Sequence, residues 1–349
     1  MPIPEVLIEK NHPAEPLAHL LWRAHQHARA AVRVALAERH RSEMSNVAVH
    51  AAMDTIYGID VVAETALLQF LGEHQHEAPA FLLVGEFEQG EALPFGRGAA
   101  PFRVLLDPID GTRLLMHQKS SGWILAGIAP EKGDNTRLSD IFFSLQTELP
   151  PLKQVFADTL WTSSLSTVSS VRTNLLTGDH TPLLLLADAA TDLQHGFVSF
   201  VNLFPRGKAL LAKLEEEFLY AQAGAELSAE ELAIHMGMIF SDQHLSTGGQ
   251  LYGLMTGQLR LVVDVRPLLN LHWRRQNEAT VLCAHPYDLA AYLIAQRAGV
   301  VLYSATGAQL DGPTNPTAEI GWIGFANSAL AKRYLQTILQ LLQRFNLVG

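Results

Sequence analysis

Two short apolar runs in the first third of the sequence each lead into an acidic residue. AFLLV at 80–84 is followed by Gly85 and Glu86, and RVLL at 103–106 is followed by Asp107. Apolar runs of this length, bounded by turn-forming residues, are typical of buried strands. The pattern therefore predicts two strands whose ends carry Glu86 and Asp107. Taken alone, a residue such as Glu86 would more often be a solvated strand end.

The most informative stretch is DPIDGT at 107–112. Asp107 and Asp110 fall within one expected turn, and carboxylates so close together repel each other unless a cation lies between them. Mg²⁺ suits such a pair, because it prefers oxygen ligands and often takes one or two carboxylates plus water and phosphate. Gly111 lets the backbone approach a ligand closely, and free N–H groups near Thr112 would bind a phosphate oxygen. The hexapeptide alone is also compatible with an ordinary acidic turn.

Helical periodicity predicts several amphipathic helices along the chain. Apolar residues recur at helical spacing over about 14–40, 60–72, 204–224, 289–298 and 328–344. Strands are expected at 122–129, 259–265 and 300–304, and the segment 131–200 is expected to be mostly strands and loops. Alternating helical and strand patterns of this kind are typical of α/β domains.

Four motifs, taken in chain order, resemble those of the inositol monophosphatase superfamily of Mg²⁺-dependent, lithium-sensitive sugar phosphatases. They span about 55 to 300 and comprise the D-x-x-x-E segment 60–64, Gly85-Glu86, DPIDGT at 107–112, and YDLAA at 287–291 followed by Ala298-Gly299. Three positions depart from the family pattern. Phe87 replaces the second acid of G-E-E, Tyr287 replaces a Trp, and Val300 replaces a Gly.

The resemblance implies a layered αβαβα sandwich of the inositol monophosphatase/fructose-1,6-bisphosphatase type. Residues 1–197 would form an N-terminal α+β domain that carries DPIDGT, and residues 198–349 a C-terminal α/β domain that carries Asp264 and Asp288. The site would lie between the two domains. A homodimer is usual for the family, so a homodimer is expected here too.

The resemblance also implies a role for individual residues at two or three Mg²⁺ ions. Glu86, Asp107 and the Ile109 carbonyl would hold the first ion. Asp107, Asp110 and Asp288 would hold the second, and Glu86 and water a looser third. Asp60 and Thr112 would orient and activate the attacking water. The substrate-binding residues would be Gly111, Thr112, Asp110, Asp264, Thr247 and Gly248.

The sequence indicates the identity of the substrate less clearly than the metal-binding residues. Arg113 and Lys119 are possible substrate contacts. The stretch between Asp264 and Asp288 has the character of an insertion. Its Arg274 and Arg275 could reach a second anionic group, although a solvated loop or a dimer contact is favoured.

These features together predict a Mg²⁺-dependent phosphomonoesterase that hydrolyses a small polyol or sugar phosphate. Fructose-1,6-bisphosphatase or 3′,5′-bisphosphate nucleotidase specificity is an alternative. A different class of function, a catalytically weak relative kept for binding or regulation, is motivated by Phe87, Tyr287 and the long middle segment. The retained pair Asp60 and Thr112 argues against it, because a pure binder needs no residues that activate water.

Composition excludes several other classes of protein. The 349 residues include 25 Lys+Arg and 35 Asp+Glu, and the net charge of −10 disfavours a nucleic-acid or anionic-membrane binder. No apolar run is long enough to span a bilayer, and MPIPEVLIEK lacks the pattern of a secretory signal. The single cysteine, Cys283, cannot form an internal disulfide, which fits a reducing cytoplasm. A cytoplasmic location is therefore expected.

Overall fold

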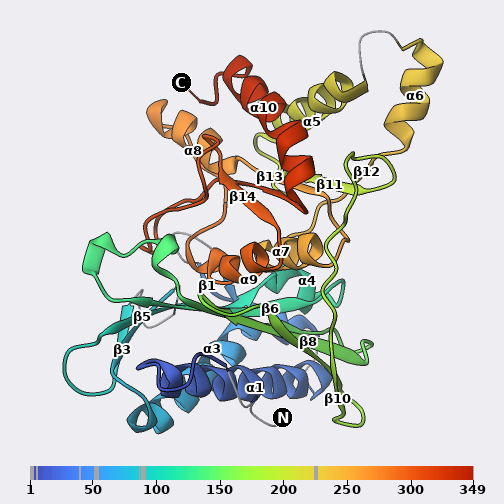
Figure 1. The fold of residues 1–349 in the computed structure, drawn as a ribbon. Helices are drawn as coiled ribbons and strands as arrows, with labels where there is room; N and C mark the ends of the chain where they lie inside the picture. Colours follow the sequence, from blue (N-terminus) through green and yellow to red (C-terminus); the bar gives the residue numbers. More distant parts are fainter. Residues whose placement is uncertain are drawn as a thin grey trace.

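The computed structural model describes residues 4, 7–38, 41–50, 55–85, 87, 92–223 and 227–348. Helices and sheets alternate in five layers (Figure 1). The lowest layer in this view contains α1 (Glu15–Glu38) and α3 (Gly58–His74), and α7 (Thr247–Met255) and α9 (Tyr292–Arg297) lie between the two large sheets. The top layer contains α5 (Lys208–Ala223), α8 (Arg266–Arg275) and α10 (Ser328–Arg344). The predicted αβαβα sandwich is confirmed.

The larger sheet has eight strands, and two neighbouring strands, β3 and β5, are those expected to lead to the predicted acids. Its order is β10 (His180–Pro182), β9 (Ser169–Asn174), β8 (Phe156–Ser163), β7 (Phe143–Leu149), β6 (Gly122–Pro130), β5 (Phe102–Asp110), β3 (Phe81–Val84) and β4 (Ala92–Phe95). Neighbouring strands are antiparallel except for the parallel pair β3 and β5. Every residue of β5 is buried, because helices cover both faces of the sheet.

The expectation that Asp107 and Asp110 share a turn is wrong in detail, because strand β5 continues to Asp110. The pairing with β6 becomes irregular after Asp107 and resumes where Asp110 faces Trp123. An irregularity of this kind bends a strand and redirects its side chains. The hexapeptide is therefore the bent end of a strand, followed at once by the short helix α4 (Thr112–Met116).

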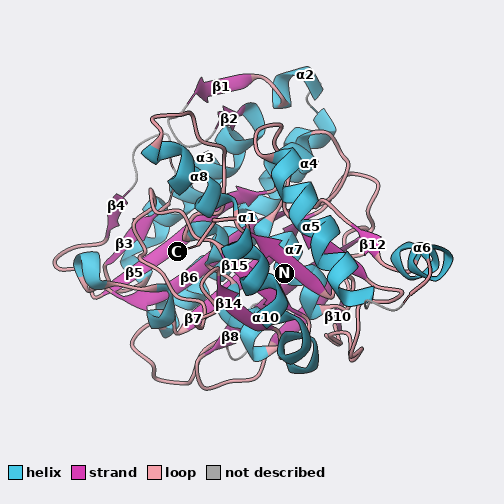
Figure 2. Ribbon diagram, turned by 90° about the horizontal axis from the view of Figure 1, so that it is seen from above, coloured by secondary structure: helices cyan, strands magenta, loops and turns pink. Residues whose placement is uncertain are grey.

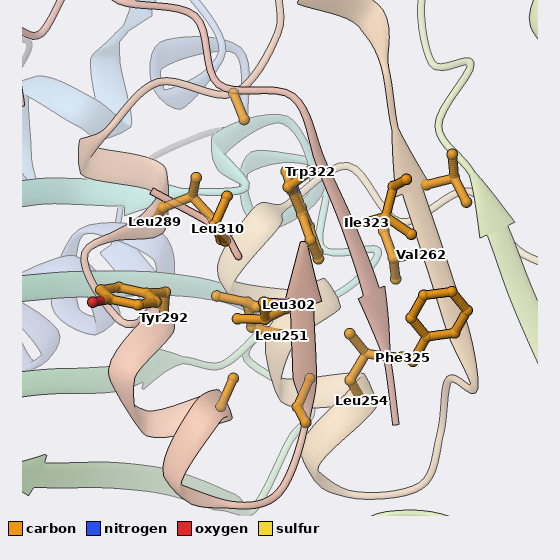
Figure 3. Packing of buried hydrophobic residues seen from close by; sticks show 14 of the residues in the cluster. Leu251, Leu254, Val262, Leu289, Tyr292, Leu302, Leu310, Trp322, Ile323 and Phe325 are labelled. Carbon is orange, nitrogen blue, oxygen red and sulfur yellow. The ribbon is translucent and has the colours of Figure 1, made fainter. Parts of the chain in front are cut away.

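The smaller sheet has five strands and lies above α7 and α9. Its order is β12 (Phe240–Ser241), β11 (Phe197–Phe200), β13 (Leu261–Asp264), β15 (Trp322–Phe325) and β14 (Val301–Ser304). Leu251 and Leu254 of α7 lie beside Leu302 and Phe325 of this sheet (Figure 3). Because α7 also contacts β5 and β6, its apolar residues join the two sheets into one core.

Most predicted helices are confirmed, because their apolar residues recur on one face. In α1 the buried residues include Leu17, Leu20, Leu21, Ala24 and Ala28. Helix α10 spans the predicted 328–344, and the Asn327 side chain caps it by accepting a hydrogen bond from the Leu330 N–H at 2.9 Å. The region 289–298 contains a short 3₁₀ turn η4 (Tyr287–Leu289) followed by α9.

The middle segment consists of β7 to β11 and their connecting loops, as expected. The stretch after Asp264 is not a loop throughout, because α8 begins there with Pro267 at its second position, where proline is favourable. Arg274 of α8 pairs with Glu319 of the same chain, with 2.9 Å between Nη1 and Oε2. The predicted boundary at 197/198 falls at the start of β11 and remains a prediction.

The remaining elements lie at the periphery of the molecule. They are α2 (Arg41–Met44), β1 (Val47–His50), β2 (Thr55–Tyr57), α6 (Ala229–Gly237), and the 3₁₀ turns η1 (Gln75–Glu77), η2 (Gly133–Asn135) and η3 (Leu138–Asp140). Helix α6 projects from the body in both views and buries none of its residues (Figures 1 and 2). Among the described residues, no helix has the length and apolar character needed to cross a membrane.

Candidate functional site

A pocket opens between the end of β5 and the first turn of α7. Its walls come from residues that are far apart in the sequence, in both halves of the chain. Eight of the predicted site residues line it: Asp60, Asp107, Ile109, Asp110, Gly111, Thr112, Thr247 and Asp288. The fold therefore brings together most of the residues that the motifs singled out.

Three carboxylates converge in this pocket. One oxygen from each of Asp107, Asp110 and Asp288 lies within 4.8 Å of the others, and Asp107 and Asp110 are each 7% exposed. Burial, followed by the charges of Asp288 and Asp110, raises the pKa of Asp107 well above its usual range. Burial and the charge of Asp288 raise the pKa of Asp110 to about 7. The raised pKa values of Asp107 and Asp110 mean that burial and mutual repulsion outweigh the groups that favour their ionised forms.

Asp110 is held by the first turn of α7. It accepts hydrogen bonds from the Ser246 hydroxyl at 2.7 Å, the Thr247 N–H at 3.1 Å and the Gly248 N–H at 2.5 Å. The N–H groups at the start of a helix have no partner within the helix, so a carboxylate there is favourable. Asp110 thus connects the larger sheet to the layer between the sheets.

Two glycines allow this close approach. Gly111 has φ +89°, a left-handed conformation, and a Cβ there would lie 3.0 Å from the Ser246 Cβ. A Cβ on Gly248 would lie 2.8 Å from Asp110 Oδ2. A side chain at either position would push α7 away from the carboxylates.

The other two carboxylates are fixed by backbone groups near them. The Ile109 N–H donates to Asp107 Oδ1 at 3.0 Å, and the His285 N–H donates to Asp288 Oδ2 at 2.5 Å. These contacts orient the carboxylates but supply no full positive charge. The oxygen donors that converge here are hard ligands, which suit Mg²⁺, Ca²⁺ or Mn²⁺ better than Zn²⁺. The residues therefore fit a divalent ion of the Mg²⁺ class.

Thr112 and Asp60 lie together on the wall beside the carboxylates. The Thr112 hydroxyl lies 2.7 Å from Asp60 Oδ1 and 2.8 Å from the Ile109 carbonyl oxygen, and it donates its proton to one of them at a time. The other oxygen of Asp60 accepts from the Tyr57 N–H at 2.9 Å, at the start of α3. The predicted pair is therefore in hydrogen-bond contact, with the carboxylate held by a helix end.

The structure gives no support for a direct substrate contact by Asp264. Its carboxylate is fully buried and accepts from Arg266 Nε at 2.8 Å and Nη2 at 2.6 Å, and Arg266 lines the pocket in its place. Sequence reasoning missed Arg266, although an arginine two residues after a buried acid is a signal for such a pair. Arg113 also lines the pocket, with its guanidinium over the rings of Tyr57 and Phe204.

Three solved structures with the same fold are named as phosphatases or described as similar to one. A crystal structure of Leishmania major fructose-1,6-bisphosphatase in holo form superposes with a TM-score of 0.66 at 13% identity, covering 99% of each chain. A Pyrococcus horikoshii protein described as similar to inositol-1 monophosphatase gives 0.55 at 15% identity, covering 92% of this chain and 96% of that one. An inositol monophosphatase from Zymomonas mobilis gives 0.55 at 16% identity, covering 94% and 99%. No family model and no curated protein matches the sequence.

The chain has the inositol monophosphatase/fructose-1,6-bisphosphatase fold. The resemblance of the four motifs to that superfamily is thus confirmed at the level of the fold. The bent strand end, the first turn of α7 and the turn η4 meet in this fold at the carboxylate pocket.

Some predicted residues of the superfamily pattern lie elsewhere or cannot be placed. Glu86 lies outside the described residues. Phe87, which departs from the pattern, is 6% exposed and packs in the hydrophobic core under the larger sheet. Gly248 contributes its N–H to Asp110 and does not line the pocket, and neither does Lys119. Tyr287 is buried at the pocket wall, with its ring centroid 5.4 Å from that of His285.

Proposed function

We propose that this chain is a Mg²⁺-dependent phosphomonoesterase that hydrolyses a small polyol or sugar phosphate. The observation that carries the proposal is the convergence of one oxygen from each of Asp107, Asp110 and Asp288 within 4.8 Å, beside the hydrogen-bonded pair Asp60 and Thr112. Fold neighbours named as fructose-1,6-bisphosphatase and inositol monophosphatase support it.

The residues proposed to hold Mg²⁺ are four acids and one backbone carbonyl. They are Glu86, Asp107, Asp110, Asp288 and the carbonyl of Ile109, for two or three ions. Bound there, Mg²⁺ would neutralise the phosphate, lower the pKa of water and stabilise the leaving oxygen. A chain of net charge −10 needs such ions to accept an anionic ester in a carboxylate-lined pocket.

The chain's own contribution to the chemistry centres on Thr112. When its hydroxyl donates to Asp60, its oxygen is free to accept a hydrogen bond from the attacking water. The proton released by that water can then pass through the hydroxyl to the Asp60 carboxylate. The N–H groups of Gly111 and Thr112 are proposed to hold the phosphate oxygens, and Thr247, which lines the pocket, is proposed to contact the sugar or polyol.

A bisphosphate substrate is a second candidate, and Arg113 favours it. Its guanidinium lies at the pocket wall over the rings of Tyr57 and Phe204, where a second anionic group could reach it. Fructose 1,6-bisphosphate and a nucleoside 3′,5′-bisphosphate both carry such a group. The weak-binder alternative is disfavoured by the intact contact between Asp60 and Thr112. Lithium sensitivity, a homodimer and a cytoplasmic location remain predictions.

The test is phosphate release from a panel of inositol, sugar and nucleotide phosphates, in Mg²⁺, in EDTA and with added lithium. Asp107→Asn removes a proposed ligand while keeping the side-chain shape, and Asp134→Asn makes the same change at an exposed position. We expect Mg²⁺-dependent turnover that is lost in the first variant and kept in the second. Equal turnover in EDTA and Mg²⁺, or an unaffected Asp107→Asn variant, would contradict the proposal.

A further inference from the structure

His285 lines the carboxylate pocket, and the chemistry described so far gives its side chain no role. Its backbone N–H holds Asp288, but the imidazole takes no part in that contact. The residue is 7% exposed, and its ring stacks on that of Tyr287, another residue of the pocket wall, with 18° between the ring planes. A firmly packed imidazole therefore belongs to the wall that a substrate would meet.

One ring nitrogen of His285 is fixed as a hydrogen-bond donor. Nδ1 lies 2.8 Å from the carbonyl oxygen of Ala318, and a carbonyl oxygen only accepts, so Nδ1 carries a proton. The backbone beside this contact is held as well, because the Ile320 N–H donates to the Ala284 carbonyl at 2.8 Å. A neutral imidazole has one N–H group and one bare nitrogen. In the neutral ring, Nε2 is therefore the bare nitrogen and an acceptor.

This acceptor has no partner in the described part of the chain, and it is open to solvent. The Nε2 atoms of His25 and His235 also lack a partner, but both are closed off from solvent inside the protein. The Nε2 of His285 is not closed off in this way. Because little of His285 is exposed and the residue lines the carboxylate pocket, the open nitrogen is presented to that pocket.

Elimination identifies the kind of group that Nε2 would accept from. A fully ionised phosphate or carboxylate has no hydrogen to donate, so it does not suit a bare nitrogen. Among the described residues, the group of acids and histidines that could hold a metal comprises Asp107, Asp110 and Asp288, without His285. A phosphate ester of a polyol or sugar carries hydroxyl groups, and a hydroxyl donates to such a nitrogen.

We propose that His285 is a specificity-determining residue whose Nε2 accepts a hydrogen bond from a hydroxyl group of the substrate. This inference rests on the proposed function, since it names a group that the substrate carries beside its phosphate. Arg266 lies on the same wall, but it offers only donors, and three of its N–H groups already bond to Asp264 and the Leu282 carbonyl. Arg266 therefore cannot take the place of this acceptor.

The experiment compares two phosphate esters that share a six-membered ring and differ in their hydroxyl groups, myo-inositol 1-phosphate and cyclohexyl phosphate. The readout is the ratio of their kcat/KM values in Mg²⁺, because effects common to both esters cancel in it. His285→Asn is the test variant, since its amide N–H lies near the position of Nδ1 and can still donate to Ala318, while the acceptor Nε2 is lost. The matched control is His74→Asn: the Nδ1 of His74 also lies 2.9 Å from a carbonyl oxygen, that of Phe70, and His74 does not line the pocket.

We expect the natural chain to prefer the inositol ester, and His285→Asn to reduce that preference about tenfold, since one hydrogen bond to the substrate is lost. His74→Asn should keep the preference. If His285→Asn does not fold, His285→Phe keeps the ring that stacks on Tyr287 and should reduce the preference as well.

The same comparison separates a failure of this inference from a failure of the phosphatase proposal. If the natural chain turns over neither ester, the ratio of their dissociation constants, measured by calorimetric titration, replaces the ratio of kcat/KM values. A natural chain that binds neither ester, or that does not prefer the inositol ester, would overturn the inference. So would a preference that the folded His285 variant keeps, or one that His74→Asn reduces equally.

Discussion

Two groups of acids contact the region of α7, and the groups that hold their carboxylates differ. Asp158 has Arg172 within 2.8 Å and the Tyr252 hydroxyl within 2.6 Å. In contrast, backbone N–H groups donate to Asp107, Asp110 and Asp288, and the charges of Asp110 and Asp288 act on Asp107. The first group is balanced by the protein itself. The second converges within 4.8 Å, which supports the proposal of a metal site there.

The largest expected difference between the two groups is in turnover. Asp107→Asn should reduce Mg²⁺-dependent phosphate release on the order of 10³-fold, because it removes a carboxylate that would hold the ion at the phosphate. Asp158→Asn should change turnover by no more than a few-fold. Initial rates at saturating Mg²⁺ measure both. Equal losses in the two variants would mean that the groups do not differ as described.

A smaller loss of turnover is expected from Thr112→Val. This change keeps the shape of the side chain and removes the hydroxyl that lies 2.7 Å from Asp60 Oδ1, so we expect a fall in kcat of about 10²-fold. Thr112→Ser restores the hydroxyl and should recover most of the activity. Mg²⁺ affinity, measured by titration, should be similar in all three proteins. A serine variant as slow as the valine variant would contradict the role of the hydroxyl.

For stability, we expect Asp158→Asn to have a larger effect than Asp107→Asn, the reverse of the order expected for turnover. Asp158→Asn weakens the contacts to Arg172 and Tyr252 and should lower the free energy of unfolding by about 1–3 kcal/mol. In EDTA, Asp107→Asn relieves repulsion with Asp110 and Asp288 and should leave stability unchanged or raise it. Urea unfolding of both variants measures this contrast. A metal-free Asp107→Asn protein that is less stable than Asp158→Asn would argue against the comparison.

The dependence of stability on pH follows from the raised pKa of Asp110. Its folded-state pKa is about 7, whereas the usual value is 3.8, so the folded protein binds more protons than the unfolded chain between these values. In metal-free protein, the contribution of Asp110 to stability is fully present below about pH 4, and it is lost as the pH rises through about 7. Mg²⁺ should reduce that loss. The measurement is the melting temperature in EDTA from about pH 4 to about pH 7. A melting temperature that rises over this range would contradict the prediction.

Local sequence patterns were sufficient to predict the main helices around the site. The spacing of apolar residues identified α1 and α10, because each buries one face on the core. The end of β5 was harder to predict. Its continuation to Asp110 depends on pairing with Trp123 of the neighbouring strand, a contact that no local pattern encodes.

The candidate site was predicted where a motif marks it, and a neighbouring side chain outside the motifs was overlooked. DPIDGT and Asp288 were found, and the fold brings them together. Asp264 was expected to contact the substrate directly, but its carboxylate accepts hydrogen bonds from Arg266. The group around Asp158 gave no sequence signal, because Glu148, Asp158, Arg172 and Tyr252 come from four separate elements with no shared motif.

The most direct test of the difference between the two acid groups is thermal melting with and without Mg²⁺. The ligands Asp107 and Asp110 lie at the end of β5 and Asp288 lies in η4, so an ion bound between them should join these parts of the fold and favour the folded state. We predict that Mg²⁺ raises the melting temperature of the natural chain and of Asp158→Asn, and leaves Asp107→Asn unchanged. A natural chain that melts at the same temperature in Mg²⁺ and in EDTA would contradict the account.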